Sequence, residues 1–274
     1  MDYTGYKFWQ LNEEEMADWY SGKLPAPTDL HINEYLIIQD SDGVMVDKYR
    51  LYSKGLKKVG FKVIGDSFTG VVKPRNLQQE LAFDMLRDDT TTVKLITGTW
   101  GTGKTMALVV AALEAVHSGK FDKIIWVRNN VQVKDTDNLG ALPGDALDKL
   151  LPYLMPFADH AGGTEGVLKL VDDGTLEVIP LGFLRGRSIR NAIIISSEAE
   201  NLTKEHIQLL MGRVDEGSNL WLDADLRQRD RVVFERSAGI ETMIERLAGE
   251  ELFGYVHLVK SERSKTAELA DKLN

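Results

Sequence analysis

The segment 98–105, which reads Gly-Thr-Trp-Gly-Thr-Gly-Lys-Thr, constrains this chain more than any other stretch. It follows the apolar run 93–96 and precedes the helix-like apolar run 106–116, so a strand, a glycine-rich loop and a helix succeed one another. Glycines let backbone N–H groups surround phosphate oxygens, and the helix N-terminus adds a positive dipole end. The segment therefore predicts a phosphate-binding loop and a nucleotide site.

Each part of this loop has an expected role at that site. Lys104 would reach the β- and γ-phosphates, and the Thr105 hydroxyl would bind Mg²⁺. The expected ligands are ATP or ADP together with Mg²⁺. The predicted nucleotide contacts are Gly98, Thr99, Trp100, Gly101, Thr102, Gly103, Lys104, Thr105 and Met106.

Composition excludes several other kinds of site. The chain has no cysteine, which excludes disulfides, thiolate metal sites and cysteine nucleophiles. Its formal charge of −9 argues against a broad nucleic-acid-coating surface, although a local basic groove would not change that sum. No apolar run approaches the roughly 20 residues that span a bilayer, and the N-terminus lacks a signal layout. We therefore expect a cytoplasmic protein without membrane contact.

The sequence divides by pattern into three predicted segments. Residues 1–30 form an extension with a short helix after the capping-box pattern at 12–15. Residues 31–70 form a small β unit, with strands at 34–39 and 44–49 around a turn and further strands near 50–52 and 61–64. Residues 71–274 alternate strands with helices, which predicts an α/β domain with a mostly parallel sheet.

The elements expected in this third segment are defined by apolar runs and their spacing. The strands are expected at 92–97, 123–128, 176–180, 191–196, 219–223 and 255–259. The helices are expected at 77–88, 103–118, 145–158, 203–212, 238–248 and 263–273. Ligands of such sheets bind at the carboxyl ends of the strands, so polar residues that follow these strands are candidate site residues.

The apolar run 192–195 ends in such a polar group. In many P-loop ATPases a strand of this kind ends in Asp-Glu, where the Asp supports Mg²⁺ and the Glu polarises the attacking water. Glu198 fits the Glu position and is predicted as a catalytic and metal-side residue; alternatively, it stabilises the N-terminus of the helix at 203–212. Ser197 occupies the Asp position and brings no negative charge.

A second polar group follows the strand at 219–223. We predict that Asp225 and Gln228 sense the γ-phosphate. The alternative is that these polar side chains only keep the loop after a buried strand in contact with solvent.

The five histidines are scattered without the spacing of metal ligands. We expect each of them on the surface, or in the core with its hydrogen bonds satisfied: His31, His117, His160, His206 and His257.

Taken together, these residues resemble the PhoH family of ATPases, whose RecA-like core is related to helicases. The resemblance covers about residues 70–274 and rests on motifs in a fixed order. Beyond the P-loop these are Pro74-Arg-Asn-Leu-Gln-Gln79, Leu139-Gly-Ala-Leu-Pro-Gly-Asp145, Arg185-Gly-Arg-Ser188, Ser197-Glu-Ala-Glu-Asn201, Ala224-Asp225 and Glu262-Arg-Ser264. The chain departs from the family pattern at Ser197 (Asp), Glu200 (Gln) and Ala224 (Gly).

The resemblance implies further roles. It implies that Gln79 reads adenine and that the protein forms a ring-like homo-oligomer, with a hexamer favoured and ATP bound between subunits. A neighbouring subunit would then supply a catalytic arginine, for which Arg213 and Arg263 are the candidates and Arg187 a third. The alternative for each arginine is a surface ion pair.

Three functions fit these patterns. The first is a Mg²⁺-dependent ATPase coupled to single-stranded RNA or DNA, as in helicases, with basic clusters at 185–190 and 227–231 lining a pore. The second is an ATP-gated assembly protein with slow or no hydrolysis, because Ser197 replaces the Mg²⁺-side Asp. The third, a small-molecule kinase, is the weakest, since no segment supplies a lid or an acceptor pocket.

Overall fold

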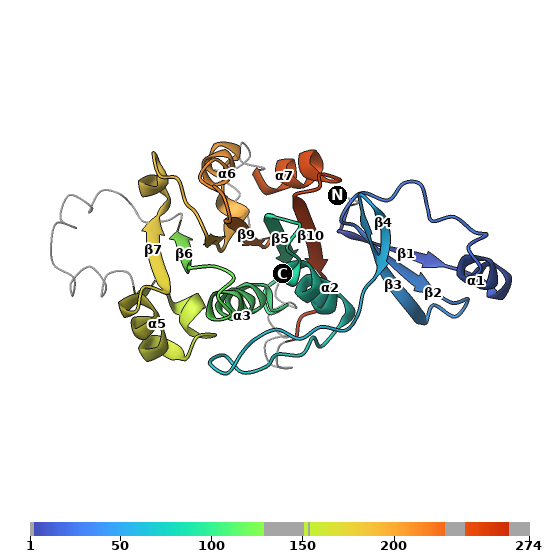
Figure 1. Ribbon diagram of the computed structural model, residues 1–274, viewed down its shortest axis with the longest axis horizontal. Coiled ribbons are helices and arrows are strands. Elements are labelled where there is room, and N and C mark those ends of the chain that lie inside the picture. The colour runs from blue at the N-terminus through green and yellow to red at the C-terminus, as the bar shows by residue number, and fades with distance from the viewer. Residues whose placement is uncertain (1–2, 129–150, 153, 228–238, 263–274) are drawn as a thin grey trace.

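Two sheets lie side by side in the computed structural model (Figure 1). The larger sheet has six parallel strands in the order β10-β5-β9-β8-β6-β7. Its strands are β5 (Val93–Gly98), β6 (Lys123–Arg128), β7 (Leu176–Pro180), β8 (Ala192–Ser196), β9 (Asn219–Ala224) and β10 (Phe253–Leu258). The structure describes residues 3–128, 151–152, 154–227 and 239–262.

Helices cover both faces of this sheet, as Figure 1 shows. On one face lie α2 (Leu77–Arg87), α3 (Lys104–His117) and α5 (Gly163–Asp172), and on the other α6 (Lys204–Met211) and α7 (Gly239–Leu247). Two short 3-10 helices, η2 (Leu181–Leu184) and η3 (Ala199–Asn201), follow β7 and β8. The strands are apolar on both sides because both sides are covered.

Successive residues of a strand contribute side chains to the hydrophobic cores on opposite faces of the larger sheet. In β6, Ile124 and Trp126 pack with α3 and α5, whereas Ile125 and Val127 pack with α6 and α7. This alternation follows from the two-residue side-chain period of a strand. The all-parallel sheet with helices on both faces confirms the predicted α/β class and is consistent with a P-loop NTPase fold.

Strand order places β9 between β5 and β8. The chain therefore leaves β5, forms β6 to β8 on one side, and returns to insert β9 beside β5. All six strands point the same way, so their carboxyl ends share one edge. The predicted strands match β5 to β10 within about two residues at each end. Of the helix expected at 145–158, residues 151–152 and 154–158 are helical, and the rest lies outside the described residues, as does the helix expected at 263–273.

The smaller sheet has the order β1-β2-β3-β4 and precedes the larger one in the chain. It consists of β1 (Tyr6–Gln10), β2 (Tyr35–Gln39), β3 (Met45–Tyr52) and β4 (Gly55–Lys58). The predicted strands at 34–39 and 44–49 correspond to β2 and β3, and 50–52 continues β3. The strand expected at 61–64 is absent, since among the described residues only Ile64 makes a bridge there, to Val72. Strand β1, which was not predicted, pairs in parallel with β2.

Helix α1 (Glu13–Tyr20) packs on the outer face of this sheet. Asn12 caps it as predicted: its Oδ1 accepts from the Glu15 N–H, and the Glu15 carboxylate accepts from the Asn12 N–H, both at 2.9 Å. The rings of Trp9 and Trp19 meet edge to face at 5.4 Å between centroids. No helix in the described ranges is long and apolar enough to cross a bilayer.

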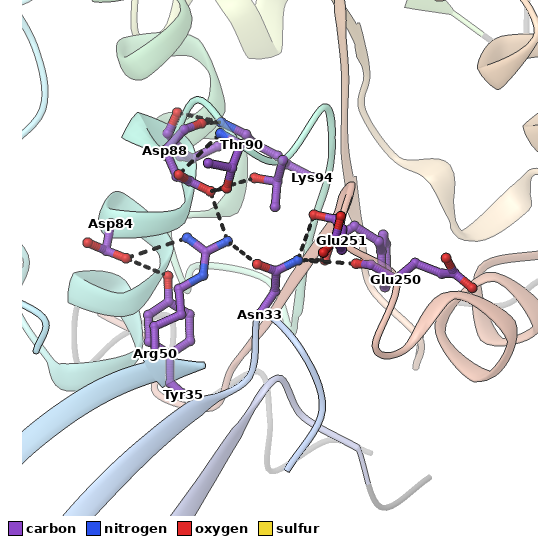
Figure 2. Close-up of polar contacts among 12 residues, drawn as sticks. Asn33, Tyr35, Arg50, Asp84, Asp88, Thr90, Lys94, Glu250 and Glu251 are labelled. Atoms are coloured by element: carbon purple, nitrogen blue, oxygen red, sulfur yellow. Dashed lines mark hydrogen bonds and ion pairs between the residues drawn. The ribbon is translucent and has the colours of Figure 1, made fainter. Parts of the chain in front are cut away.

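A buried network around Arg50 joins the two sheets (Figure 2). The Arg50 guanidinium lies 3.0 Å from the Asp88 carboxylate and 3.6 Å from the Asp84 carboxylate, both at the end of α2. It also donates to the Asn33 side-chain oxygen at 3.0 Å. The Asn33 amide in turn donates to the backbone carbonyls of Glu250, Glu251 and Phe253 at the start of β10. The smaller sheet is thereby fixed against both α2 and β10.

A second buried basic side chain, that of Lys94, lies near Asp88 (Figure 2). Lys94 in β5 donates to the carbonyl of Leu86 at 2.9 Å and to that of Asp88 at 2.6 Å. Burial lowers the pKa of the Lys94 ammonium to about 7, against the opposing attraction of Asp88. The carboxyl end of α2 is therefore held from two sides by basic groups.

Replacing Arg50 with methionine is expected to lower the free energy of unfolding by about 3 kcal/mol, because Asp88 would stay largely buried without its cation. Urea unfolding measures the change. Lys57→Met is the matched control, since Lys57 lies opposite Arg50 in the β3–β4 register and is exposed. Equal unfolding midpoints for the two variants would contradict the role assigned to Arg50.

Candidate functional site

The glycine-rich loop leaves the carboxyl end of β5 and enters α3, as predicted. Two of its glycines are required by space and backbone geometry. Gly98 has φ +155°, and a Cβ there would lie 2.6 Å from the Leu258 carbonyl oxygen. Gly103 has φ +90° and would bring a Cβ to 3.1 Å from the Gln79 amide nitrogen. Larger residues at either position would force the loop away from its neighbours.

Lys104 is held over this loop. Its Nζ donates to the carbonyls of Gly98 at 2.7 Å and Thr99 at 2.9 Å. The ammonium therefore lies where the loop curves, which is where phosphate oxygens bind in glycine-rich loops of this kind.

Two neighbouring segments brace the loop from behind. The Gln79 side chain accepts from the Arg75 N–H at 2.8 Å and donates to the Thr102 carbonyl at 3.0 Å. The Glu262 N–H donates to the Gly101 carbonyl at 2.9 Å. Gln79 is buried at 3% exposure, so the described contacts give it a bracing role; adenine recognition by Gln79 remains a prediction.

Asp223 joins three chain segments at the carboxyl edge of the sheet, and sequence analysis did not single it out. Its Oδ2 accepts from the Thr105 hydroxyl at 2.5 Å, and its Oδ1 accepts from the Glu198 N–H at 2.9 Å. Asp223 lies near the end of β9, Thr105 begins α3, and Glu198 follows β8. The sequence signal was an acidic residue directly after the apolar run 220–222.

Glu198 adopts a backbone conformation that few non-glycine residues use. Its φ of 55° and ψ of 46° lie in the left-handed region. The bond from its N–H to Asp223 fixes this turn, which directs the chain from β8 into η3. Such strained positions occur where a side chain must be presented to a site. The sequence prediction that Glu198 lies at the site thus has a geometric counterpart.

Asp225 and Glu200 lie beside Asp223 and Glu198 at the carboxyl edge of the sheet, and they contact each other. The Asp225 N–H donates to the Glu200 carboxylate at 3.1 Å, and the Asp225 carboxylate accepts from the Arg227 N–H at 3.0 Å. Burial raises the pKa of the Glu200 carboxyl, and the nearby charges of Asp223 and Glu198 raise it further. The region around Asp223 is therefore strongly acidic.

These groups border one cavity of about 380 Å³. Among the predicted nucleotide contacts and catalytic residues, its lining includes Trp100, Gly101, Gly103, Lys104, Thr105, Met106, Glu198 and Asp225. The lining residues that sequence analysis had not predicted are His160, Glu200, Asp223 and Ala224. Gly98, Thr99, Thr102 and Gln79 are not among the lining residues. The cavity joins the loop to the acidic strand ends, as a nucleotide site at this edge requires.

A family model described as PhoH-like protein matches residues 71–271. The chain belongs to the PhoH family. The family is an ATP-binding one, and in this member the matched region contains the glycine-rich loop and every residue that lines the cavity.

Named relatives support this membership. Protein PhoH2 of Bacillus subtilis is 31% identical over 289 aligned positions, which cover 99% of this chain and 64% of that protein. Protein PhoH2 of Thermobispora bispora is 33% identical over 214 positions, 77% of this chain and 49% of that protein. The PhoH-like protein of Mycobacterium tuberculosis is 33% identical over 162 positions, 58% of this chain and 45% of that protein. This chain therefore spans about half to two thirds of the PhoH2 relatives.

Two of the three arginines suggested by the PhoH pattern, Arg213 and Arg187, lie away from the cavity. Arg213 precedes β9 at the amino edge of the sheet, where its guanidinium donates to the Arg187 carbonyl at 3.1 Å. Arg187 pairs with Glu177 at 3.0 Å, and Arg190 pairs with Asp215 at 3.0 Å. Arg213 and Arg187 therefore do not contact the cavity of their own chain. Action on a neighbouring subunit remains a prediction, and Arg263 and Gln228 lie outside the described residues.

The acidic groups fit a magnesium ion that is shared with a nucleotide. Asp223 is 1% exposed and forms no ion pair with a basic group in the part of the chain that the structure describes. A buried carboxylate without a counter-ion is unfavourable, and phosphate oxygens beside it would add repulsion. No three His, Asp or Glu side chains of the described ranges converge as a complete metal cage. Mg²⁺ commonly takes one or two protein ligands and completes its shell with phosphates and water, which suits Thr105 and these carboxylates.

Replacing Glu200 with glutamine is expected to raise the Tm of the nucleotide-free protein at neutral pH. The raised pKa of Glu200 means that folding disfavours its charged form, so the penalty is present above the folded-state pKa. It disappears as the pH falls through the ordinary glutamate range, because both states are then protonated. Glutamine keeps an acceptor for the Asp225 N–H. Thermal unfolding over a pH series tests this, and an advantage that persisted in acid would contradict it.

Proposed function

We propose that this chain binds ATP with Mg²⁺ and hydrolyses it. The observation that carries the proposal is the continuous chain of contacts from Thr105 through Asp223 to Glu198, beside a glycine-rich loop and on the border of one cavity. The residues that we assign to phosphate, to magnesium and to the attacking water thus lie around the same cavity.

Each residue would have a separate task in this reaction. Backbone N–H groups of the loop and the Lys104 ammonium would hold the phosphates. Mg²⁺ would neutralise charge on the β- and γ-phosphate oxygens. Glu198 would orient a water molecule toward the γ-phosphorus and accept its proton, after which ADP and phosphate leave. Asp225, which follows β9 and lines the same cavity, would sense the γ-phosphate.

The contact between Asp223 and Thr105 favours hydrolysis over the nucleotide-gated assembly alternative. That alternative depends on the missing aspartate at Ser197. Asp223 supplies a carboxylate to the same threonine from the adjacent strand, so the site does not lack negative charge beside Thr105.

Lys104→Ala is expected to abolish nucleotide binding and turnover, because the loop would lose its phosphate-binding cation. Glu198→Gln is expected to lower kcat by about 10²–10⁴-fold, the usual range for a general base, while nucleotide affinity stays close to that of the unaltered protein. Phosphate release and calorimetric titration with ADP measure the two effects. Equal turnover in the unaltered protein and Lys104→Ala would show that the activity is a contaminant.

Coupling to a nucleic acid is a finer proposal that rests on the family resemblance. Single-stranded RNA or DNA would bind at exposed basic side chains such as Arg185, although Arg187 and Arg190 are engaged in ion pairs within the chain. A ring, with a hexamer favoured, would bring several copies of these side chains together.

We expect single-stranded RNA or DNA to stimulate ATP turnover at low salt, with stimulation that falls steeply as salt rises, because phosphate contacts release counterions. Turnover is compared with and without each strand, and light scattering with and without ATP reports the oligomer. Turnover that neither strand changes at low salt would remove the nucleic-acid proposal and leave the ATPase proposal intact.

A further inference from the structure

We infer that Asp223 is the magnesium-side carboxylate of this protein, and that this function has moved from the end of β8, at Ser197, to the end of the neighbouring strand β9. The inference rests on the proposed function, because it assigns a role within the same nucleotide site. It predicts that the metal dependence of nucleotide binding is set by Asp223.

Strand order makes such a move feasible. Strand β9 lies directly between β5, which carries the glycine-rich loop, and β8. Ser196 pairs with Leu222 in the β8–β9 register, so Ser197 follows the end of β8 beside Asp223, which is still within β9 and pairs with Ile96 of β5. A carboxylate at the end of β9 is one strand nearer to the loop than one at the end of β8.

The contacts of Asp223 are those expected of a magnesium-side aspartate. One carboxylate oxygen accepts from Thr105, the predicted magnesium ligand, at 2.5 Å. The other accepts from the N–H of Glu198, the predicted base, at 2.9 Å. Asp223 therefore connects the metal-binding hydroxyl to the residue that would orient water.

Ser197 makes no comparable contact. It is 3% exposed, and its hydroxyl oxygen has no hydrogen-bond partner among the residues that the structure describes. A buried hydroxyl without a partner is unfavourable, and this one supplies no negative charge. The single Thr105 hydroxyl hydrogen is already donated to Asp223.

Charge balance points the same way. The two hydrogen-bond donors to Asp223 among the described residues are neutral, a hydroxyl and a backbone N–H. Within the described ranges no lysine or arginine forms an ion pair with it, although it is buried at 1% exposure. A divalent cation beside Thr105 would supply the missing positive charge. A neutral asparagine at this position could keep both contacts, because its oxygen would accept from the Glu198 N–H and its NH2 group would donate to the Thr105 hydroxyl. Charge is therefore the property to test.

The experiment is a titration of ADP binding by calorimetry, with and without Mg²⁺, together with electron paramagnetic resonance of Mn²⁺ in the ADP complex. Asp223→Asn is expected to weaken metal binding in the complex by about 10–100-fold, the usual effect of removing a group that supports a metal site. When a chelator removes the metal, the affinity of the Asp223→Asn variant for ADP is expected to equal or exceed that of the unaltered protein. Asp122→Asn is the charge-matched control, because Asp122 is exposed at the amino edge of the sheet and should change neither.

A second variant tests the exchange directly and serves if Asp223→Asn does not fold. The pair Asp223→Ser with Ser197→Asp returns the carboxylate to the end of β8, and we expect it to recover most of the metal affinity that Asp223→Ser alone loses. Unchanged metal dependence in Asp223→Asn, or a loss in Ser197→Ala as large as the loss in Asp223→Asn, would overturn the inference. Failure of the unaltered protein to bind ADP in either condition would instead refute the proposed function.

Discussion

The site depends on one carboxylate, that of Asp223, which joins three chain segments. Asp223 extends from β9 and accepts hydrogen bonds from the start of α3 and from the residue after β8, so the loop and the turn at Glu198 are held at a fixed separation. The left-handed backbone at Glu198 is maintained by the same bond. Without it, the glycine-rich loop and the Glu198 turn would be joined only through the sheet.

Helix α2 connects this site to the smaller sheet. Near its N-terminus, Gln79 contacts the loop carbonyl of Thr102. At its other end, Asp84 and Asp88 form ion pairs with Arg50 of the smaller sheet (Figure 2). The helix is therefore held at one end by the nucleotide loop and at the other by the buried ionic network. A change in the position of the smaller sheet would act on the loop through this helix, which gives the N-terminal region a physical connection to the site.

Much of the larger domain could be read from the sequence because its signals are local. Each strand of the parallel sheet is a short apolar run, and the loop is recognised by residues that are consecutive in the chain. Strand β1 escaped prediction because its five residues lie beside a strong helix signal and pair with residues of β2 that are 29 positions further along the chain. His160 escaped because its approach to the cavity depends on how distant segments pack, and nothing in its neighbouring residues indicates that approach.

The sequence by itself determined the glycine-rich loop between β5 and α3, the α/β class and the acidic residues at the ends of the strands, because each of these is set by residues close together in the chain. Only the tertiary structure decided which acidic residue accepts the hydrogen bond from the Thr105 hydroxyl. The sequence shows a serine where an aspartate is expected and an aspartate after the next strand, but it does not show that β9 lies between β8 and β5. Strand order is a property of long-range packing, and it is this order that brings Asp223 to Thr105.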